Sequence, residues 1–98
     1  MNKRVRLSPS AKQDLAVILE YLIYRWNSKT ANNFIDTFQE NLKRISGNPE
    51  QFPLFRKDMS VRKCVLTKHN VIYFREGASN IEVIRIFDAR QNPDTLKF

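Results

Sequence analysis

The spacing of apolar residues changes once along this chain, and the change limits the folds that it can adopt. From residue 11 to residue 45, apolar side chains recur at every third or fourth position, which is typical of amphipathic helices. From residue 61 to residue 87 they fall in short runs rich in Val, Ile, Phe and Tyr, which are typical of β-strands. Two helices followed by several strands predict an α+β fold in which the helices cover one face of a sheet.

The helical part is predicted to be a hairpin of two antiparallel helices. Ser8–Pro9 is the expected start of the first helix, because Ser caps a helix N-terminus and Pro fits the first helical position. Asn27–Ser28 interrupts the pattern, and Ser28 is the expected cap of the second helix. Gly47 is the expected C-cap glycine of that helix. A break this short favours an antiparallel arrangement of the two helices.

Each predicted helix carries one apolar stripe, which we expect to face the sheet. Asp14 and Glu20 stand among the polar positions of the first helix, where we expect exposure to solvent. The two stripes comprise Ala11, Leu15, Ile18, Leu19, Leu22, Ile23 and Trp26 in the first helix, and Ala31, Phe34, Ile35, Phe38, Leu42 and Ile45 in the second.

Strands are predicted on both sides of the helical hairpin. Lys3–Ser8 alternates basic and apolar residues, as a half-buried strand does. After a loop at residues 51–58, the segments Val61–Thr67, Val71–Arg75 and Ile81–Phe87 form a β-meander. The predicted order is β-α-α-β-β-β, with the helix hairpin packed on one face of a small, mainly antiparallel sheet. The neighbour of the first strand stays open.

The alternation of side chains predicts which residues face away from the helices. Ile72, Phe74, Ile84 and Ile86 suit the helix-covered face. The other face is expected to carry Tyr73, Arg75, Val83, Arg85 and Phe87, with Arg4 and Arg6 from the first strand. Arginines among aromatic residues suit phosphates and bases, and they suit an acidic amphipathic peptide equally. The alternative is an open face kept soluble by Arg stems that cover apolar neighbours. The orientation of Arg62 stays open.

Charge and composition restrict the partners of the chain. Its 98 residues predict one domain over residues 1–98, and a hydrophobic content of 42% argues against disorder. Seventeen Lys and Arg against ten Asp and Glu give a net charge of +7, which favours nucleic acid or an acidic protein as a partner.

The single cysteine and single histidine exclude an internal disulfide and a Cys- or His-cluster metal site, so no metal or cofactor is expected. Cys64 lies among strand residues and is expected to be buried and inert, while His69 is expected in an exposed turn. No apolar stretch has the length of a signal peptide or a membrane span, so we expect a cytosolic protein without membrane partners.

Several stretches, taken in order, resemble the RelE/ParE family of bacterial toxins. They are RVRLSPSAKQDL, the helix ILEYL and its following Trp, the NP after the second helix, VRKCVLTKHNVIYF, and IEVIRIFDARQNP. The resemblance extends from Val5 to Pro93, and it is the ordered set that is specific. It implies a growth-inhibiting toxin of a chromosomal or plasmid-stabilising type II toxin–antitoxin module. A cognate antitoxin, expected to be short and acidic, would form a hetero-oligomer by wrapping the toxin with helices and often a strand.

The family divides in activity, and the residues of this chain favour one side. RelE-like members cut mRNA on the ribosome without a metal, whereas ParE-like members inhibit DNA gyrase. Asn70 stands where ribonuclease members commonly have Arg, Asp88–Ala89 stands where some have His-Tyr, and no Tyr follows Arg90. Arg62 and Arg90 do match recurrent basic residues of the family. The resemblance therefore favours a ParE-like toxin that binds its target without catalytic residues of its own.

The expected contacts to target or antitoxin combine the basic loop tip with the open sheet face. They are Arg56, Lys57, Arg62, Tyr73, Arg75, Arg85, Phe87 and Arg90. One alternative is a ribosome-dependent mRNA endoribonuclease in which Arg62, Arg85 and Arg90 stabilise the charge of the phosphorane. Because Arg is a poor acid or base, such an enzyme would also use a general base that the sequence does not identify. Another is a relative without toxicity that serves as a protein-interaction module.

Overall fold

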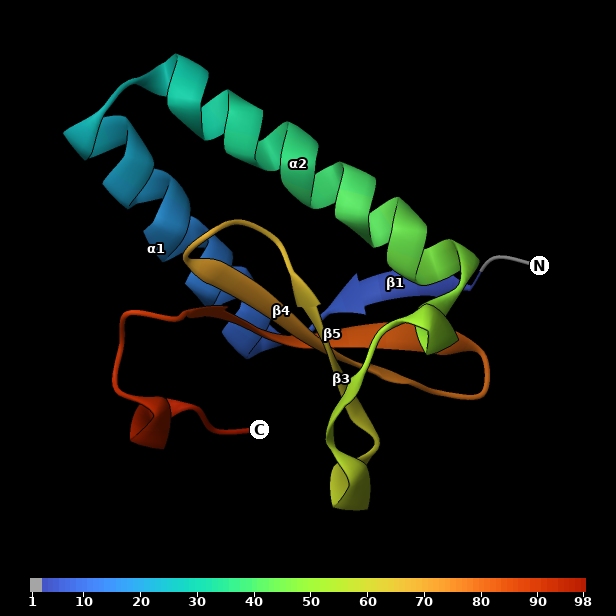
Figure 1. Ribbon diagram of the computed structural model, residues 1–98. Helices are drawn as coiled ribbons and strands as arrows, with labels where there is room; N and C mark the ends of the chain where they lie inside the picture. The colour runs from blue at the N-terminus through green and yellow to red at the C-terminus, as the bar shows by residue number, and fades with distance from the viewer. Residues whose placement is uncertain (1–2) are drawn as a thin grey trace.

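The computed structural model describes residues 3–98 and places two helices on one side of a five-stranded sheet (Figure 1). The elements are β1 (Arg4–Leu7), α1 (Pro9–Arg25), α2 (Ser28–Gly47), β2 (Leu54–Arg56), β3 (Val61–Val65), β4 (Asn70–Glu76) and β5 (Asn80–Asp88). The strand order is β1-β5-β4-β3-β2, with β1 parallel to β5 and every other pair antiparallel. The predicted α+β architecture, a helix hairpin on a mainly antiparallel sheet, is confirmed.

The predicted order of elements lacks one strand, because the segment expected to be a loop contains the short strand β2. Leu54 pairs with Arg62 and Arg56 pairs with Val61 across an irregular register. Three residues are too few to show a period-two pattern, so the sequence carries no signal for this edge strand. The observed order is therefore β-α-α-β-β-β-β.

The helix boundaries confirm one predicted cap and correct two. Ser8 caps α1, since its Oγ accepts a hydrogen bond from the Ala11 N–H at 3.0 Å. Asn27, and not Ser28, caps α2, with its Oδ1 accepting from the Thr30 N–H at 2.9 Å. Gly47 is the last helical residue and does not adopt a positive φ, so the helix ends without a left-handed glycine.

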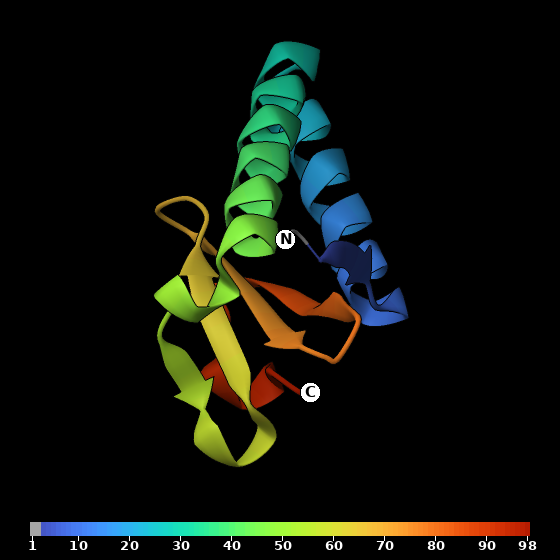
Figure 2. The same ribbon diagram turned by 90° about the vertical axis from the view of Figure 1, so that its right-hand side faces the viewer.

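The apolar stripe of α1 packs against the core as far as Leu22 and is uncovered at its C-terminal end. Ala11 is buried and Leu15 packs against the core, whereas Ile23 and Trp26 are 54% and 67% exposed. The hairpin extends past the end of the sheet, so the outer turns of α1 have no strand beneath them (Figure 2). The predicted burial of Ile23 and Trp26 is therefore wrong. Within residues 3–98, neither helix is long and apolar enough to cross a bilayer.

Buried residues form two clusters, one on each face of the sheet. The main core lies between helices and sheet and includes Phe34, Phe38, Ile45, Ile72, Phe74, Ile81, Val83 and Ile86. The second cluster lies on the opposite face, called the open face below, and consists of Val61, Tyr73, Ile84 and Phe87, with Met59, Val71 and Leu96 packed against it.

A β-bulge in β5 corrects the predicted facing of two residues. Tyr73 pairs with Arg85 and Phe74 pairs with Val83, which leaves Ile84 as an extra residue. The extra residue shifts the alternation by one position. Val83 therefore joins the core under the helices, and Ile84 joins the cluster on the open face. The predicted facing of Val83 and Ile84 is the reverse and is therefore wrong.

We expect Phe74→Ala to lower the free energy of unfolding by about 3–5 kcal/mol, because the ring is fully buried under the helices and leaves a cavity. Val65→Ala, at an exposed position of the adjacent strand, should change it by less than about 0.5 kcal/mol. Urea denaturation followed by circular dichroism measures both. Equal losses in the two variants would contradict this division between core and surface.

Candidate functional site

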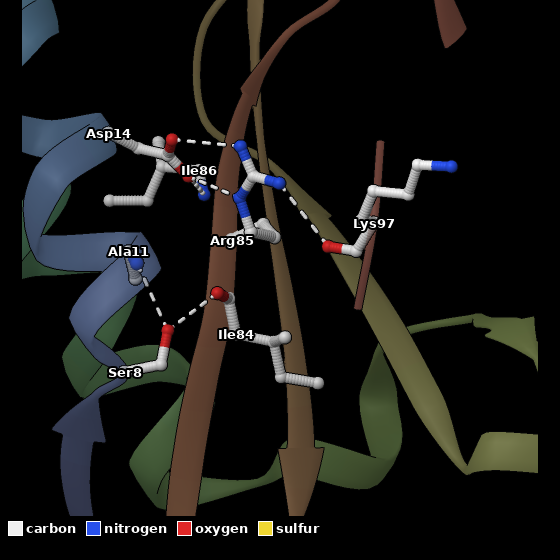
Figure 3. A network of polar contacts seen from close by, with 7 residues as sticks. All are labelled: Ser8, Ala11, Asp14, Ile84, Arg85, Ile86 and Lys97. Atoms are coloured by element: carbon white, nitrogen blue, oxygen red, sulfur yellow. Dashed lines mark hydrogen bonds and ion pairs between the residues drawn. The ribbon is translucent and has the colours of Figure 1, made fainter. Parts of the chain in front are cut away.

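Side chains at the start of α1 complete the edge of β5 beyond the end of β1. The Ser8 N–H donates to the Val83 carbonyl at 2.9 Å, and the Ser8 Oγ donates to the Ile84 carbonyl at 2.7 Å. Asp14 Oδ2 accepts from the Ile86 N–H at 3.0 Å (Figure 3). These hydrogen bonds fasten helix α1 to β5. They also pair backbone groups of β5 that would otherwise remain unpaired at the edge of the strand.

Asp14 also holds the guanidinium of Arg85 through two hydrogen bonds. Arg85 Nε lies 2.7 Å from Oδ2 and Nη2 lies 3.0 Å from Oδ1. The two side chains are only 16% and 21% exposed, so the expected solvent exposure of Asp14 is wrong. The hydrogen bonds that Arg85 donates to Asp14 raise the pKa of Arg85, which stays a cation. Its Nη1 donates to the Lys97 carbonyl at 3.2 Å, on the open-face side of β5 (Figure 3).

The open face carries an aromatic group that the sequence analysis only partly identified. Tyr73 lies with its ring centroid 4.7 Å from that of Phe55 and 5.4 Å from that of Phe98. Burial raises the pKa of the Tyr73 phenol. The segment around Phe98 crosses the face opposite the helices, where Leu96 packs on the second cluster (Figure 1). We refer to Phe55, Tyr73 and the second cluster as the aromatic platform.

The part of the open face next to β1 is charged. Arg75 pairs with Glu82 at 3.4 Å, and both side chains are nearly half exposed. Arg6 lies beside them and lines the same shallow depression of about 220 Å³. This depression has cations and carboxylates in close proximity, so its net field is weak.

Arg90 lies in a different place, at a groove between α1 and the end of β5. Its guanidinium pairs with Asp88 at 2.7 Å and lies 6.0 Å from the centre of the Tyr21 ring. The groove continues past Trp26 and His69 and encloses about 330 Å³. His69 is half buried along its wall, so its expected full exposure is wrong.

Arg90 and Asp88 hold each other in their charged forms. The hydrogen bond from Arg90 keeps the pKa of Asp88 below its ordinary value, and the same contact raises the pKa of Arg90. Because the pKa of Asp88 is depressed in the folded state, its contribution to stability is present above the ordinary carboxyl pKa and is lost as pH falls through the folded value. At neutral pH the pair is fully ionised.

The remaining predicted contacts lie at two further positions. Arg56 forms two hydrogen bonds with Asp58 at the exposed tip beside β2, next to Lys57. Arg62 stands opposite Phe74 and therefore on the helix-covered face, where its Nη1 donates to the Phe52 carbonyl at 2.7 Å. The structure thus brings Tyr73, Arg75, Arg85 and Phe87 to one face. Arg85 and Phe87 also line, together with Arg90, a depression of about 330 Å³ beside α1, whereas Arg56 and Arg62 lie apart from it.

Residues 3–98 include no group of three or more His, Cys, Asp or Glu side chains that could hold a metal ion. Cys64 is buried as predicted, and burial raises the pKa of its thiol.

The sequence over residues 5–93 matches the family described as the ParE toxin of the type II toxin–antitoxin system, parDE. The chain belongs to this toxin family. Its membership agrees with the resemblance to RelE/ParE toxins found in the sequence. No curated protein sequence matches the chain.

Solved structures share the fold of this ParE-family chain at low sequence identity. The chromosomal ParDE system from P. aeruginosa has a TM-score of 0.77 and 18% identity, covering 90% of this chain and 97% of that one. The E. coli DinJ–YafQ toxin–antitoxin complex gives 0.61 and 8%, covering 90% and 93%. The RelBE2 toxin–antitoxin complex from Mycobacterium tuberculosis gives 0.58 and 13%, covering 90% and 99%. At these identities the likeness concerns the fold.

We expect Asp14→Ala to destabilise this ParE-family chain by about 2–4 kcal/mol, because it removes acceptors for a partly buried guanidinium and a strand N–H. A double-mutant cycle with Arg85→Ala should give a coupling free energy of about 1–2 kcal/mol. The matched cycle on Arg75 and Glu82, a more exposed and longer pair, should give about 0.5 kcal/mol or less. Thermal unfolding measures both cycles, and equal couplings would contradict a special role of Asp14.

Proposed function

We propose that this chain is a cytoplasmic toxin that inhibits growth by binding DNA gyrase and that a cognate antitoxin neutralises it. The membership in the ParE family supports this proposal, because the resemblance implies gyrase as the target of ParE-like members. The single structural observation that carries it is the separation of the basic side chains. Arg56, Arg62 and Arg90 lie at three different places. Arg56, Arg85 and Arg90 are each engaged by a carboxylate of the chain.

That separation argues for contacts with a macromolecule over a chemical step on RNA. Stabilising a phosphorane requires cations that converge on one phosphate, placed beside groups that transfer protons. Here Arg62 lies on the helix-covered face and Arg85 is engaged by Asp14, while Arg90 faces the groove. An extended protein surface, in contrast, can be contacted at several separate points.

The groove at Arg90 has the composition of an interface anchor. Arg, Tyr and Trp are the residue types that dominate binding energy at protein interfaces. Arg90, Tyr21 and Trp26 line this groove together, and the exposed end of α1 continues it with further apolar side chains. We therefore assign the principal gyrase contact to this groove.

An acidic antitoxin suits the remainder of the surface. The net charge of +7 is distributed over the fold and favours a partner of opposite charge. Three structures of similar fold are described as toxin–antitoxin systems or complexes, which supports a hetero-oligomer for this chain too.

Expression of the chain without an antitoxin tests the target. We expect growth arrest with an SOS response, intact mRNA in primer-extension assays, and inhibition of supercoiling by purified gyrase. Incubation of the purified chain with ribosomes and mRNA in vitro checks that the mRNA stays uncleaved. Cleavage of mRNA on the ribosome, with gyrase unaffected, would overturn the gyrase target in favour of a ribonuclease.

We expect Arg90→Ala to abolish growth inhibition while the melting temperature stays nearly unchanged, because the exposed guanidinium contributes to the groove and not to the core. Lys43→Ala, an exposed cation on α2, is the charge-matched control and should remain toxic. Arg56→Ala removes the other Arg that pairs with an Asp two residues away, so it tests whether the β2 tip also contacts the target. Unaltered toxicity of Arg90→Ala would remove the groove from the site.

A further inference from the structure

Residues 96–98 lie on the open face in the manner of a bound peptide. Leu96 packs on the second cluster, and the Phe98 ring lies against Tyr73 and Phe55. Between them, the Lys97 carbonyl accepts a hydrogen bond from Arg85 while its side chain points away from Arg85 (Figure 3). Two apolar side chains at alternate positions face the sheet, and the backbone between them is held by a fixed donor. This is how surfaces recognise extended segments.

The hold on this segment is weak compared with the rest of the fold. Phe98 and Phe55 remain 36% and 41% exposed although they contact each other. The hydrogen bond from Arg85 to the Lys97 carbonyl is longer, at 3.2 Å, than the bonds that Arg85 makes to Asp14. Segments with few buried contacts and exposed hydrogen bonds open locally before the core does.

The surface beneath the segment persists when the segment leaves. Tyr73, Ile84 and Phe87 project from strands in the centre of the sheet, and Arg85 is fixed by Asp14 independently of Lys97. Lys63 lies 6.0 Å from the centre of the Phe55 ring and adds a cation at the rim. The uncovered platform is therefore a preformed apolar surface with a side-chain donor for a peptide carbonyl and a basic border.

We propose that the aromatic platform is a peptide-binding surface and that residues 96–98 occupy it as a displaceable internal ligand. The external ligand is an extended segment of a protein partner with apolar side chains two residues apart and acidic residues nearby. The internal segment competes with it because both use Arg85 and the same apolar positions. The involvement of gyrase as such a partner rests on the proposed function, but the existence of the platform does not.

Competition of this kind predicts a measurable gain when the internal ligand is weakened. A tethered segment has an effective concentration on the order of millimolar, so it occupies even a modest site for most of the time. The apparent affinity for an external segment equals its intrinsic affinity multiplied by the fraction of molecules whose platform is open. Removing the two apolar anchors should raise that affinity roughly ten-fold or more.

The test uses the double variant Leu96→Ser with Phe98→Ser, the single variant Phe98→Ala, and Asp94→Ser as a matched tail control. The probe is a synthetic peptide of residues 92–98 (NPDTLKF), titrated into ¹⁵N-labelled protein and followed by NMR. We expect the peptide to shift the amide signals of Tyr73 and Arg85 in the double variant, more weakly in Phe98→Ala, and not in the wild type or Asp94→Ser. A peptide in which Ser replaces Leu and Phe should shift none of them.

Two results would overturn the proposal. One is a double variant that keeps the dispersed spectrum of the folded protein yet binds the peptide no better than wild type. The other is a single-stranded oligonucleotide that shifts Tyr73 and Arg85 when the peptide does not, which would assign the surface to nucleic acid.

A second arm measures inhibition of gyrase supercoiling, where the double variant should act at lower concentration than wild type, and a weaker effect would contradict competition. If wild type leaves gyrase unaffected, the proposed function fails, and the peptide titration still decides whether the platform exists.

Discussion

The junction of α1 with β5 is the constraint on which the arrangement of the molecule depends. β1 pairs with β5 only as far as Val83, so the second half of β5 would otherwise have an unpaired edge. Ser8 and Asp14 take over that edge with side-chain hydrogen bonds to Ile84 and Ile86. Ser8 also caps α1, so the helix starts where the strand pairing ends. The direction of the helix hairpin across the sheet follows from these contacts, together with the packing of its inner turns.

The bulge at Ile84 decides which aliphatic side chain completes the apolar cluster on the open face. Without the extra residue, Ile84 would have remained under the helices and Val83 would have stood beside Tyr73 and Phe87. With it, Ile84 joins Tyr73 and Phe87 on a surface that no helix covers. An apolar surface of this kind requires a cover or a partner. Residues 96–98 supply the cover, at the cost of leaving their own aromatic side chain partly in solvent.

The fold could be predicted from local sequence signals, whereas contacts between residues that are far apart in the sequence could not. Helix periodicity, the Ser8 cap and the strand alternation are properties of neighbouring residues, and they led to the correct architecture. The facing of Val83 and Ile84 depends on how β5 pairs with β4, and the pair of Asp14 with Arg85 joins residues 71 positions apart. The exposure of Ile23 and Trp26 depends on where the sheet ends, which no local pattern records. Among the candidate site residues, Tyr73, Arg75, Arg85 and Phe87 were placed on the correct face, but that placement does not test their proposed role.

Arg56, Arg75, Arg85 and Arg90 each pair with a carboxylate, and this pairing bears on how such a surface can act. Arg85 is immobilised at the edge of the platform by Asp14, so it presents its remaining N–H in one direction. Arg90 is held by Asp88 over the Tyr21 ring in the same way. A fixed guanidinium loses little conformational entropy when a partner binds, whereas a free Lys or Arg side chain must be ordered at that moment. The carboxylates lower the net charge of each site but orient its donors, and orientation serves selective recognition of one protein surface more than general attraction to a polyanion.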